Sequence, residues 1–200
     1  MAIGAFTTLR NLLVSRLTIG IGGLLALGLT TAQTVVDAMS PHAVPTVAAG
    51  TPIVAGRWQV TLHEASLSTD KRPDGYRGRP GTKALAVDLD LANRSSESNN
   101  VVSRILSITP PIAGLSPTPT AYLMRDGALL GALQPGLPER IRMVWEVPDT
   151  TPVPETLRLV VTGETFKPRD NLFAAPGWFN PKPVAAVTLP LKQAGKDPDR

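Results

Sequence analysis

Short runs in which apolar and polar residues alternate recur along the chain after Gly56, and this period of two constrains the fold most strongly. Trp58, Val60 and Leu62 alternate with polar neighbours, and the stretch from Leu85 to Leu91 repeats the pattern. Successive side chains of a strand point to opposite faces of a sheet, so the pattern indicates strands with one buried face. Such runs lie within residues 58–63, 85–91, 102–108, 120–125, 128–133, 140–147, 157–162 and 184–191.

The arrangement of these runs predicts an all-β fold. Prolines lie at nearly every boundary between runs, and no convincing helical pattern follows Val36. A parallel sheet would need crossover helices, for which the short connections leave no room. We therefore expect an antiparallel β-sandwich.

Individual residues predict where strands turn and end. Asp126-Gly127 lies between two apolar runs, which is a strong signal for a hairpin turn. Pro148 should end the preceding strand because proline cannot donate a hydrogen bond to a sheet. Trp145 occupies an inward position of that strand and should be buried.

The N-terminal segment is apolar and predicts a membrane anchor. Residues Leu17 to Val36 carry no charge, and twenty residues of helix span about 30 Å, the thickness of the hydrocarbon core of a bilayer. Arg10 and Arg16 precede the segment and Asp37 follows it. The positive-inside rule then places residues 1–16 in the cytoplasm and the body outside. The alternative is a secretory signal peptide cleaved near residues 30–32 or 36–38, which also leaves the body outside.

The remaining boundaries follow from composition. Residues 38–56 contain three prolines and no acidic or basic residue, so we assign 37–55 to an extended linker between the anchor at 17–36 and the body. The β-sandwich domain is assigned to residues 56–191, and a polar tail to residues 192–200.

Composition excludes several classes of function. The chain has no cysteine, which excludes disulfides, thiol catalysis, iron–sulfur clusters and zinc sites built on cysteine. Without Arg10 and Arg16, 18 basic residues face 16 acidic ones. A net charge of about +2 is too weak to predict nucleic-acid binding.

The body resembles a known group of domains. The run from Leu85 to Asn93, the turn at residues 133–136, the strand ending in Val144-Trp145-Glu146-Val147-Pro148 and the run from Leu157 to Val161 carry the resemblance. They resemble the bacterial extracytoplasmic immunoglobulin-like domains of unknown function, which are similar in fold to a secreted mycobacterial immunoprotective antigen. The resemblance implies an immunoglobulin-like sandwich behind an N-terminal membrane signal. It supplies no catalytic motif, and this chain lacks the lipobox cysteine that many relatives have.

No constellation of residues predicts catalysis, a metal or a cofactor. His63 is expected on the solvated face of its strand, with Glu64 pointing the other way, and no nucleophile motif accompanies it. Asp88 and Asp90 are spaced for one face of a strand, but the pattern around them is not that of a calcium loop. We expect them on a solvated outer face.

Two segments are candidate partner-binding surfaces. The loop of residues 68–82 carries Lys71, Arg72, Tyr76, Arg77 and Arg79, which suit a protein interface, anionic headgroups or an anionic wall polymer. The plainer interpretation is a connection that its charges keep soluble.

The second segment, residues 166–183, contains Trp178 and Phe179 together with Phe166 and Phe173. We expect these rings to fold back and seal one end of the sandwich. Exposed rings would instead suit a protein partner or the bilayer surface.

These features favour a membrane-anchored extracytoplasmic binding or scaffolding module of the cell envelope, such as an accessory subunit of a membrane complex. The expected partners are the membrane, through the anchor, and an envelope protein, with no nucleic acid and no cofactor. One alternative is an envelope hydrolase with carboxylate catalysis, which would need convergent carboxylates in a concave pocket. The other is a secreted ligand-binding domain.

Overall fold

A computed structural model describes residues 44–68, 79–172 and 174–193, and within these ranges the chain is all-β, as predicted. The predicted anchor at 17–36, the segment 1–16 that is predicted to be cytoplasmic, and most of the tail lie outside the described residues. No helix within the described ranges is long and apolar enough to cross a membrane. The strands are β1 (Ile53–Ala55), β2 (Trp58–Ser68), β3 (Thr82–Asn93), β4 (Leu106–Thr109), β5 (Thr120–Leu123), β6 (Pro138–Pro148), β7 (Thr156–Lys167) and β8 (Gly177–Gln193).

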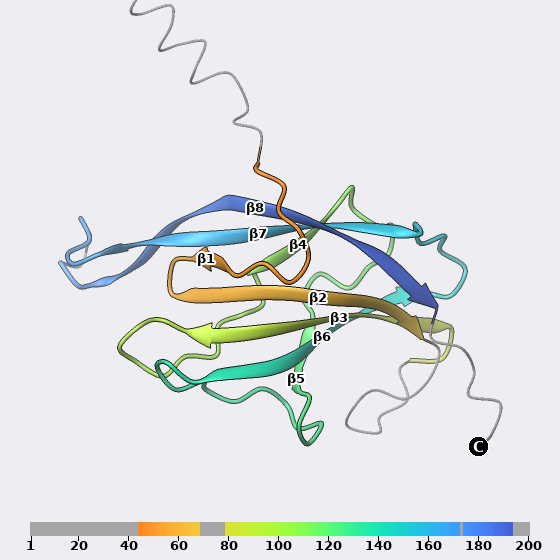
Figure 1. The fold of residues 1–200 in the computed structure, drawn as a ribbon, viewed down its shortest axis with the longest axis horizontal. Coiled ribbons are helices and arrows are strands. Elements are labelled where there is room, and N and C mark those ends of the chain that lie inside the picture. The colour runs from red at the N-terminus through yellow and green to blue at the C-terminus, as the bar shows by residue number, and fades with distance from the viewer. Residues whose placement is uncertain (1–43, 69–78, 173, 194–200) are drawn as a thin grey trace, which may run out of the picture. The chain divides into compact units, whose positions relative to one another are not determined.

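The strands form one continuous sheet in the order β4-β7-β8-β2-β3-β6-β5, and β1 pairs with β2 beside this path (Figure 1). β7 and β8 form an antiparallel hairpin, and β2, β3 and β6 form an antiparallel block. The two parts join where β2 and β8 run parallel, from Ala65 opposite Leu191 to Leu67 opposite Gln193.

Both parts of the sheet contribute to one core, the arrangement expected of a β-sandwich. Most apolar residues of the alternating runs are buried, although Met124 and Leu129 are exposed, and Trp145 is only 3% exposed, which confirms its inward position. Burying each large apolar side chain contributes about 1.5–3 kcal/mol. The core includes Trp58, Val60 and Leu62 of β2, Leu85, Val87, Leu89 and Leu91 of β3, Ile141, Met143, Trp145 and Val147 of β6, Leu157, Leu159 and Val161 of β7, and Ala185, Val187 and Leu189 of β8.

A β-bulge in β2 corrects the expected direction of Glu64. The register with β3 shifts between Leu62 and Glu64, so His63 is the extra residue. The bulge turns Glu64 to the outer face together with His63. There Glu64 accepts a hydrogen bond from Lys192 Nζ at 2.7 Å. Ala65 after the bulge is buried like Leu62 before it.

The hairpin turn predicted at Asp126-Gly127 is present. The N–H of Leu123 donates to the Ala128 carbonyl at 2.8 Å, and Gly127 has φ +71°, which glycine adopts without strain. The N–H of Ala128 donates to the Asp126 carboxylate, which lowers the pKa of that carboxyl below its ordinary value. The return run does not form a strand as predicted, because its pairing is limited to two isolated bridges, between Tyr122 and Leu129 and between Asn99 and Leu133.

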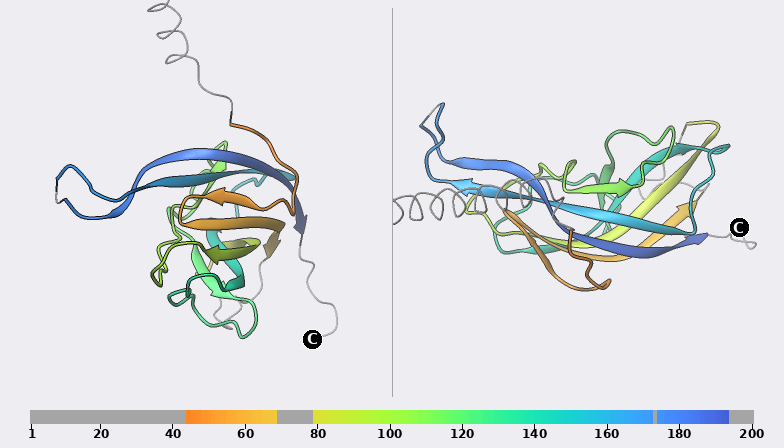
Figure 2. Two further views of the ribbon diagram at one scale, coloured as in Figure 1. Left: turned by 60° about the vertical axis from the view of Figure 1, so that its left-hand side comes forward. Right: turned by 90° about the horizontal axis from the view of Figure 1, so that it is seen from above.

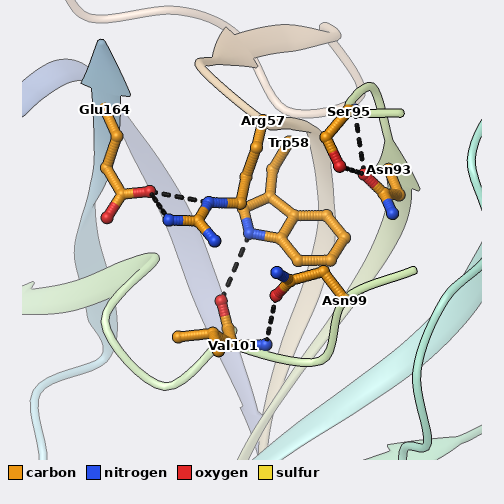
Figure 3. Close-up of polar contacts among 7 residues, drawn as sticks. All are labelled: Arg57, Trp58, Asn93, Ser95, Asn99, Val101 and Glu164. Carbon is orange, nitrogen blue, oxygen red and sulfur yellow. Dashed lines mark hydrogen bonds and ion pairs between the residues drawn. The ribbon is translucent and has the colours of Figure 1, made fainter. Parts of the chain in front are cut away.

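Side chains hold the loop that follows β3 (Figure 3). Asn93 is fully buried, and its Nδ2 donates to the carbonyls of Glu97 and Leu133 at 2.7 and 2.9 Å. Its Oδ1 accepts the N–H of Ser95 at 2.9 Å. The indole N–H of Trp58 donates to the Val101 carbonyl at 3.2 Å. These bonds fix the loop against the core.

Part of the segment that the sequence assigns to the linker pairs with the sheet. β1, at 53–55, lies inside the range 37–55. The N–H of Val47 donates to the Ala186 carbonyl at 2.9 Å, and the N–H of Ala186 donates to the Pro45 carbonyl at 2.8 Å. Residues 45–47 therefore extend the sheet along β8.

Candidate binding surface

The hairpin of β7 and β8 continues well beyond the strands that flank it. β4 pairs with β7 only as far as Val161, whereas β7 and β8 remain paired out to Lys167 and Gly177. We call residues 164–182 the ribbon, and Figure 2 shows it projecting from the rest of the sheet. The sequence predicts a Pro-rich loop here. That prediction is wrong because two register shifts between β7 and β8 break the alternation and prolines interrupt β8.

The base of the ribbon is fixed to the turn between β1 and β2. Gly56 has φ +71°, and a Cβ at this position would overlap the carbonyl oxygen of Glu164. The next residue, Arg57, donates from Nε to Glu164 Oε2 at 2.8 Å, and its Nη2 lies 2.7 Å from the same oxygen (Figure 3). Both side chains are partly buried, so this ion pair is less screened than a pair at the open surface.

Aromatic rings stabilise the ribbon from one strand to the other. Phe166 and Trp178 are directly opposite in the register, with ring centroids 5.3 Å apart and an interplanar angle of 57°. Arg57 Cζ lies 5.8 Å from the centroid of Trp178, and Lys167 Nζ lies 5.6 Å from that of Phe179. Each contact falls within the range of a cation–π interaction.

These rings do not seal the sandwich, contrary to the sequence-based expectation. Phe166 is 50% exposed, and Trp178 and Phe179 are half-buried on the ribbon, outside the apolar core. The physical reason is that Phe166 and Trp178 lie on strands that have already passed the edge of the core. Phe173 lies outside the described residues.

The tip of the ribbon presents an exposed apolar side chain. Leu172 is 80% exposed, the largest exposed fraction among the large hydrophobic residues described. Its N–H donates to Asp170 Oδ1 at 2.6 Å, and the N–H of Asp170 donates to the Ala175 carbonyl at 2.9 Å. These bonds shape the turn. Arg169 is exposed in the turn just after β7, whereas Lys182 is exposed at the base of the ribbon, opposite Gly163.

Of the candidate residues in the basic loop, residues 68–82, the structure describes Arg79 alone. Arg79 is largely exposed, with Nε 3.6 Å from Glu146 Oε2. Lys71, Arg72, Tyr76 and Arg77 lie outside the described residues, so binding through this loop stays a prediction.

Acidic residues of the outer face of the β2-β3-β6 block take part in ion pairs. Arg142 donates to both Asp88 oxygens, at 2.6 and 2.7 Å, and these hydrogen bonds raise the pKa of Arg142 above its ordinary range. Asp90 lies between His63 Nε2 at 2.8 Å and Arg140 Nη1 at 3.2 Å. In the part of the chain that the structure describes, no group of three His, Cys, Asp or Glu side chains could hold a metal ion.

A hollow that sequence reasoning missed lies beside the hairpin turn. Its volume is about 310 Å³, and the ion pair between Arg125 and Glu139, 2.6 Å apart, lies at its wall. No short-range sequence signal could have found it, because its lining comes from the separate positions Leu123, Arg125, Gly131, Ala132, Leu133, Gln134, Leu137 and Glu139.

Comparison with known proteins identifies no family. No protein-family model and no curated protein matches the chain. Among solved structures, an uncharacterised β-sandwich protein from Clostridium difficile aligns over 72% of this chain and 93% of its own, with 13% identity and a TM-score of 0.44. A candidate lipoprotein from Staphylococcus aureus aligns over 74% of this chain and 97% of its own, with 11% identity and a TM-score of 0.41.

Proposed function

We propose that this protein is a non-enzymatic binding module of the cell envelope, anchored in the membrane by residues 17–36 and making contact through the ribbon. We also propose that its sheet belongs to the immunoglobulin-like class of β-sandwich. The observation that carries the functional proposal is the exposed apolar and aromatic surface of the ribbon, formed by Phe166, Leu172 and Trp178.

Apolar side chains that stay exposed on a projecting hairpin do not help the protein to fold. A two-stranded ribbon outside a core is marginal in water, and an exposed leucine gains nothing from folding. Here the Arg57–Glu164 pair and the Phe166–Trp178 contact hold the ribbon in place. A rigid projection that presents apolar groups is typical of a contact surface.

The ion pairs of the outer face support a binding role over carboxylate catalysis. A glycosidase needs two carboxylates that flank a substrate. Asp88 and Asp90 instead contact arginines of β6, and Glu64 contacts Lys192. The hydrolase alternative therefore has less support than the binding module.

Site-specific photo-crosslinking tests the contact surface. A photoreactive amino acid replaces Leu172 in the full chain expressed in bacterial cells, and a matched variant carries it at Thr188, an exposed position of β8 inside the sheet. Adducts, with either protein or lipid, should form from position 172 and not from position 188. Equal labelling from both positions, or none from position 172, would contradict the proposal.

A reporter fusion tests the predicted anchor. An enzyme that is active only in the cytoplasm, fused after Arg200, should be inactive, because Arg10 and Arg16 retain the N-terminus inside. The same reporter fused after Arg16 should be active. Activity of the C-terminal fusion would overturn the orientation, and a mature N-terminus found by mass spectrometry after residue 30 would make the segment a cleaved signal.

A further inference from the structure

We propose that the ribbon binds the surface of an anionic lipid bilayer, with Leu172 entering the headgroup region and the nearby cations meeting lipid phosphates. This inference rests on the proposed function, since it names the partner of the same contact surface. Three observations carry it: the order of side chains along the ribbon, their charge, and the features that disfavour a protein strand as partner.

Side chains along the ribbon follow the gradient of a membrane interface. Leu172, the most exposed apolar side chain, occupies the tip. Behind it come Arg169 and Lys167, and then the Phe166–Trp178 pair. Tryptophan favours the headgroup level, and long cationic side chains reach toward the phosphates while their stems stay in apolar surroundings.

The charge of the outer ribbon complements an anionic surface. Beyond its base the ribbon carries two cationic side chains, Lys167 and Arg169, and the single carboxylate of Asp170, which accepts the Leu172 N–H. The acidic residue at the base, Glu164, is paired with Arg57. Each cation close to an anionic bilayer contributes about 1 kcal/mol, so the ribbon can gain from electrostatic attraction as well as from apolar insertion.

The ribbon is poorly suited to the usual ways of binding a protein. A partner strand would have to pair with an edge of the ribbon, but Pro176 and Pro181 interrupt the β8 side and Pro168 ends the β7 side. A standard protein interface uses some 20–30 residues on each side, whereas Phe166 and Leu172 are the only strongly exposed large apolar residues among those described on the ribbon. Shallow insertion into a bilayer needs no more than such a tip.

The length of the chain before the fold favours contact with the same membrane that holds the predicted anchor. The predicted span ends at Val36, and the described fold begins at Val44. Val36 and Val44 are eight positions apart, so the chain between them spans at most about 29 Å when fully extended. A tether this short keeps the body close to the bilayer, so even weak contacts of the ribbon form at high effective concentration.

Quenching of tryptophan fluorescence tests the proposal. The chain has three tryptophans, of which Trp58 and Trp145 are buried in the core while Trp178 lies on the ribbon. The full chain is reconstituted with vesicles of phosphatidylglycerol and phosphatidylcholine whose acyl chains are brominated near the headgroup. Emission should fall relative to unbrominated vesicles, and the Trp178→Phe variant, which keeps an aromatic ring, should lose this quenching.

Matched charge variants separate a specific anionic contact from a general effect of net charge. Lys167→Gln with Arg169→Gln removes both cations of the outer ribbon, and Arg94→Gln with Arg104→Gln removes two exposed cations elsewhere. The first pair should weaken the ribbon's contact equilibrium by about fivefold per cation, and the second pair should leave it unchanged. Vesicles of brominated phosphatidylcholine alone should quench weakly.

The outcomes distinguish this inference from the proposed function. Quenching that is equal in both lipids, or unchanged by Lys167→Gln with Arg169→Gln, overturns binding to anionic lipid. Absence of quenching in the unaltered chain also overturns it, and that measurement needs no variant to fold. If protein adducts nevertheless form at position 172 in cells, the ribbon remains a contact surface and its partner is a protein. If neither quenching nor adducts occur, both proposals fail.

Discussion

Tryptophan side chains occupy two kinds of environment in this protein, and their positions decide what each contributes. Trp145 lies on β6 opposite Leu85 of β3, and its ring belongs to the apolar core. Trp178 contacts Phe166 and Arg57 on the ribbon and remains partly exposed. The first ring stabilises the fold, whereas the second presents a surface.

Truncating the two rings should therefore give different losses of stability. Trp145→Ala should lower the free energy of unfolding by about 3–5 kcal/mol, because it leaves a cavity in the core. Trp178→Ala should cost about 1 kcal/mol or less, the value of one aromatic pair at the surface. Urea unfolding followed by circular dichroism measures both. Similar losses in the two variants would mean that the ribbon and the core are not energetically separate.

Two acidic residues of β3, Asp88 and Asp90, also differ in burial and therefore in what they should contribute to stability. The Asp88 side chain is 10% exposed and accepts two hydrogen bonds from Arg142, while the Asp90 side chain is 41% exposed. Asp88→Ala should cost about 2 kcal/mol, since it leaves a half-buried guanidinium without its partner. Asp90→Ala should cost less than about 1 kcal/mol. The same urea titration checks the pair, and a larger loss for Asp90→Ala would contradict this assignment.

At the scale of single elements, the sequence predicts strands well where alternation is continuous and poorly where bulges interrupt it. The runs in β3 and β6 are regular, and their buried residues are the predicted ones. The bulge in β2 leaves a trace, because Leu62 and Ala65 are three residues apart rather than two. The ribbon leaves no comparable trace, since register shifts and prolines hide its strands.

Deleting the extra residue of β2 tests the bulge directly. Without His63, Leu62 and Ala65 would be spaced by two, and the register with β3 would become continuous. The deletion should leave a folded protein. Its loss in free energy of unfolding should be no larger than the loss caused by Trp145→Ala. Deleting Thr61, a paired residue, should prevent folding because it turns Trp58 and Val60 to the wrong face. Circular dichroism and thermal unfolding compare the two deletions. A folded Thr61 deletion, or an unfolded His63 deletion, would refute the assignment of the bulge.

At the scale of the whole molecule, the sequence predicts the class of fold but not which distant strands pair with each other. Alternation identifies which face of a strand is buried, yet it carries no information about which distant strand pairs with it. The parallel contact of β2 with β8 joins residues more than a hundred positions apart. The pairing of residues 45–47 with Ala186 is equally non-local, and for that reason a proline-rich segment resembles a linker in the sequence. The ribbon could be recognised only from both the buried faces of its strands and their pairing with each other.

The contribution of residues 44–52 can be measured on two fragments. Residues 44–193 contain every described strand together with the segment that pairs along β8, and residues 53–193 lack that segment. The shorter fragment loses two hydrogen bonds to Ala186 and the contact of Val47 with the core. Each such hydrogen bond contributes about 0.5–1.5 kcal/mol, so the shorter fragment should be less stable by about 1–3 kcal/mol.

Size-exclusion chromatography and urea unfolding should show that both fragments are β-rich, because the main core comes from strands that they share. Exposure of the β8 edge should also make the shorter fragment associate more readily, since an unpaired edge offers backbone groups to another chain. Equal stability and equal association would mean that residues 44–52 act as a linker despite their pairing. Failure of the longer fragment to fold would mean that residues outside it contribute to the core.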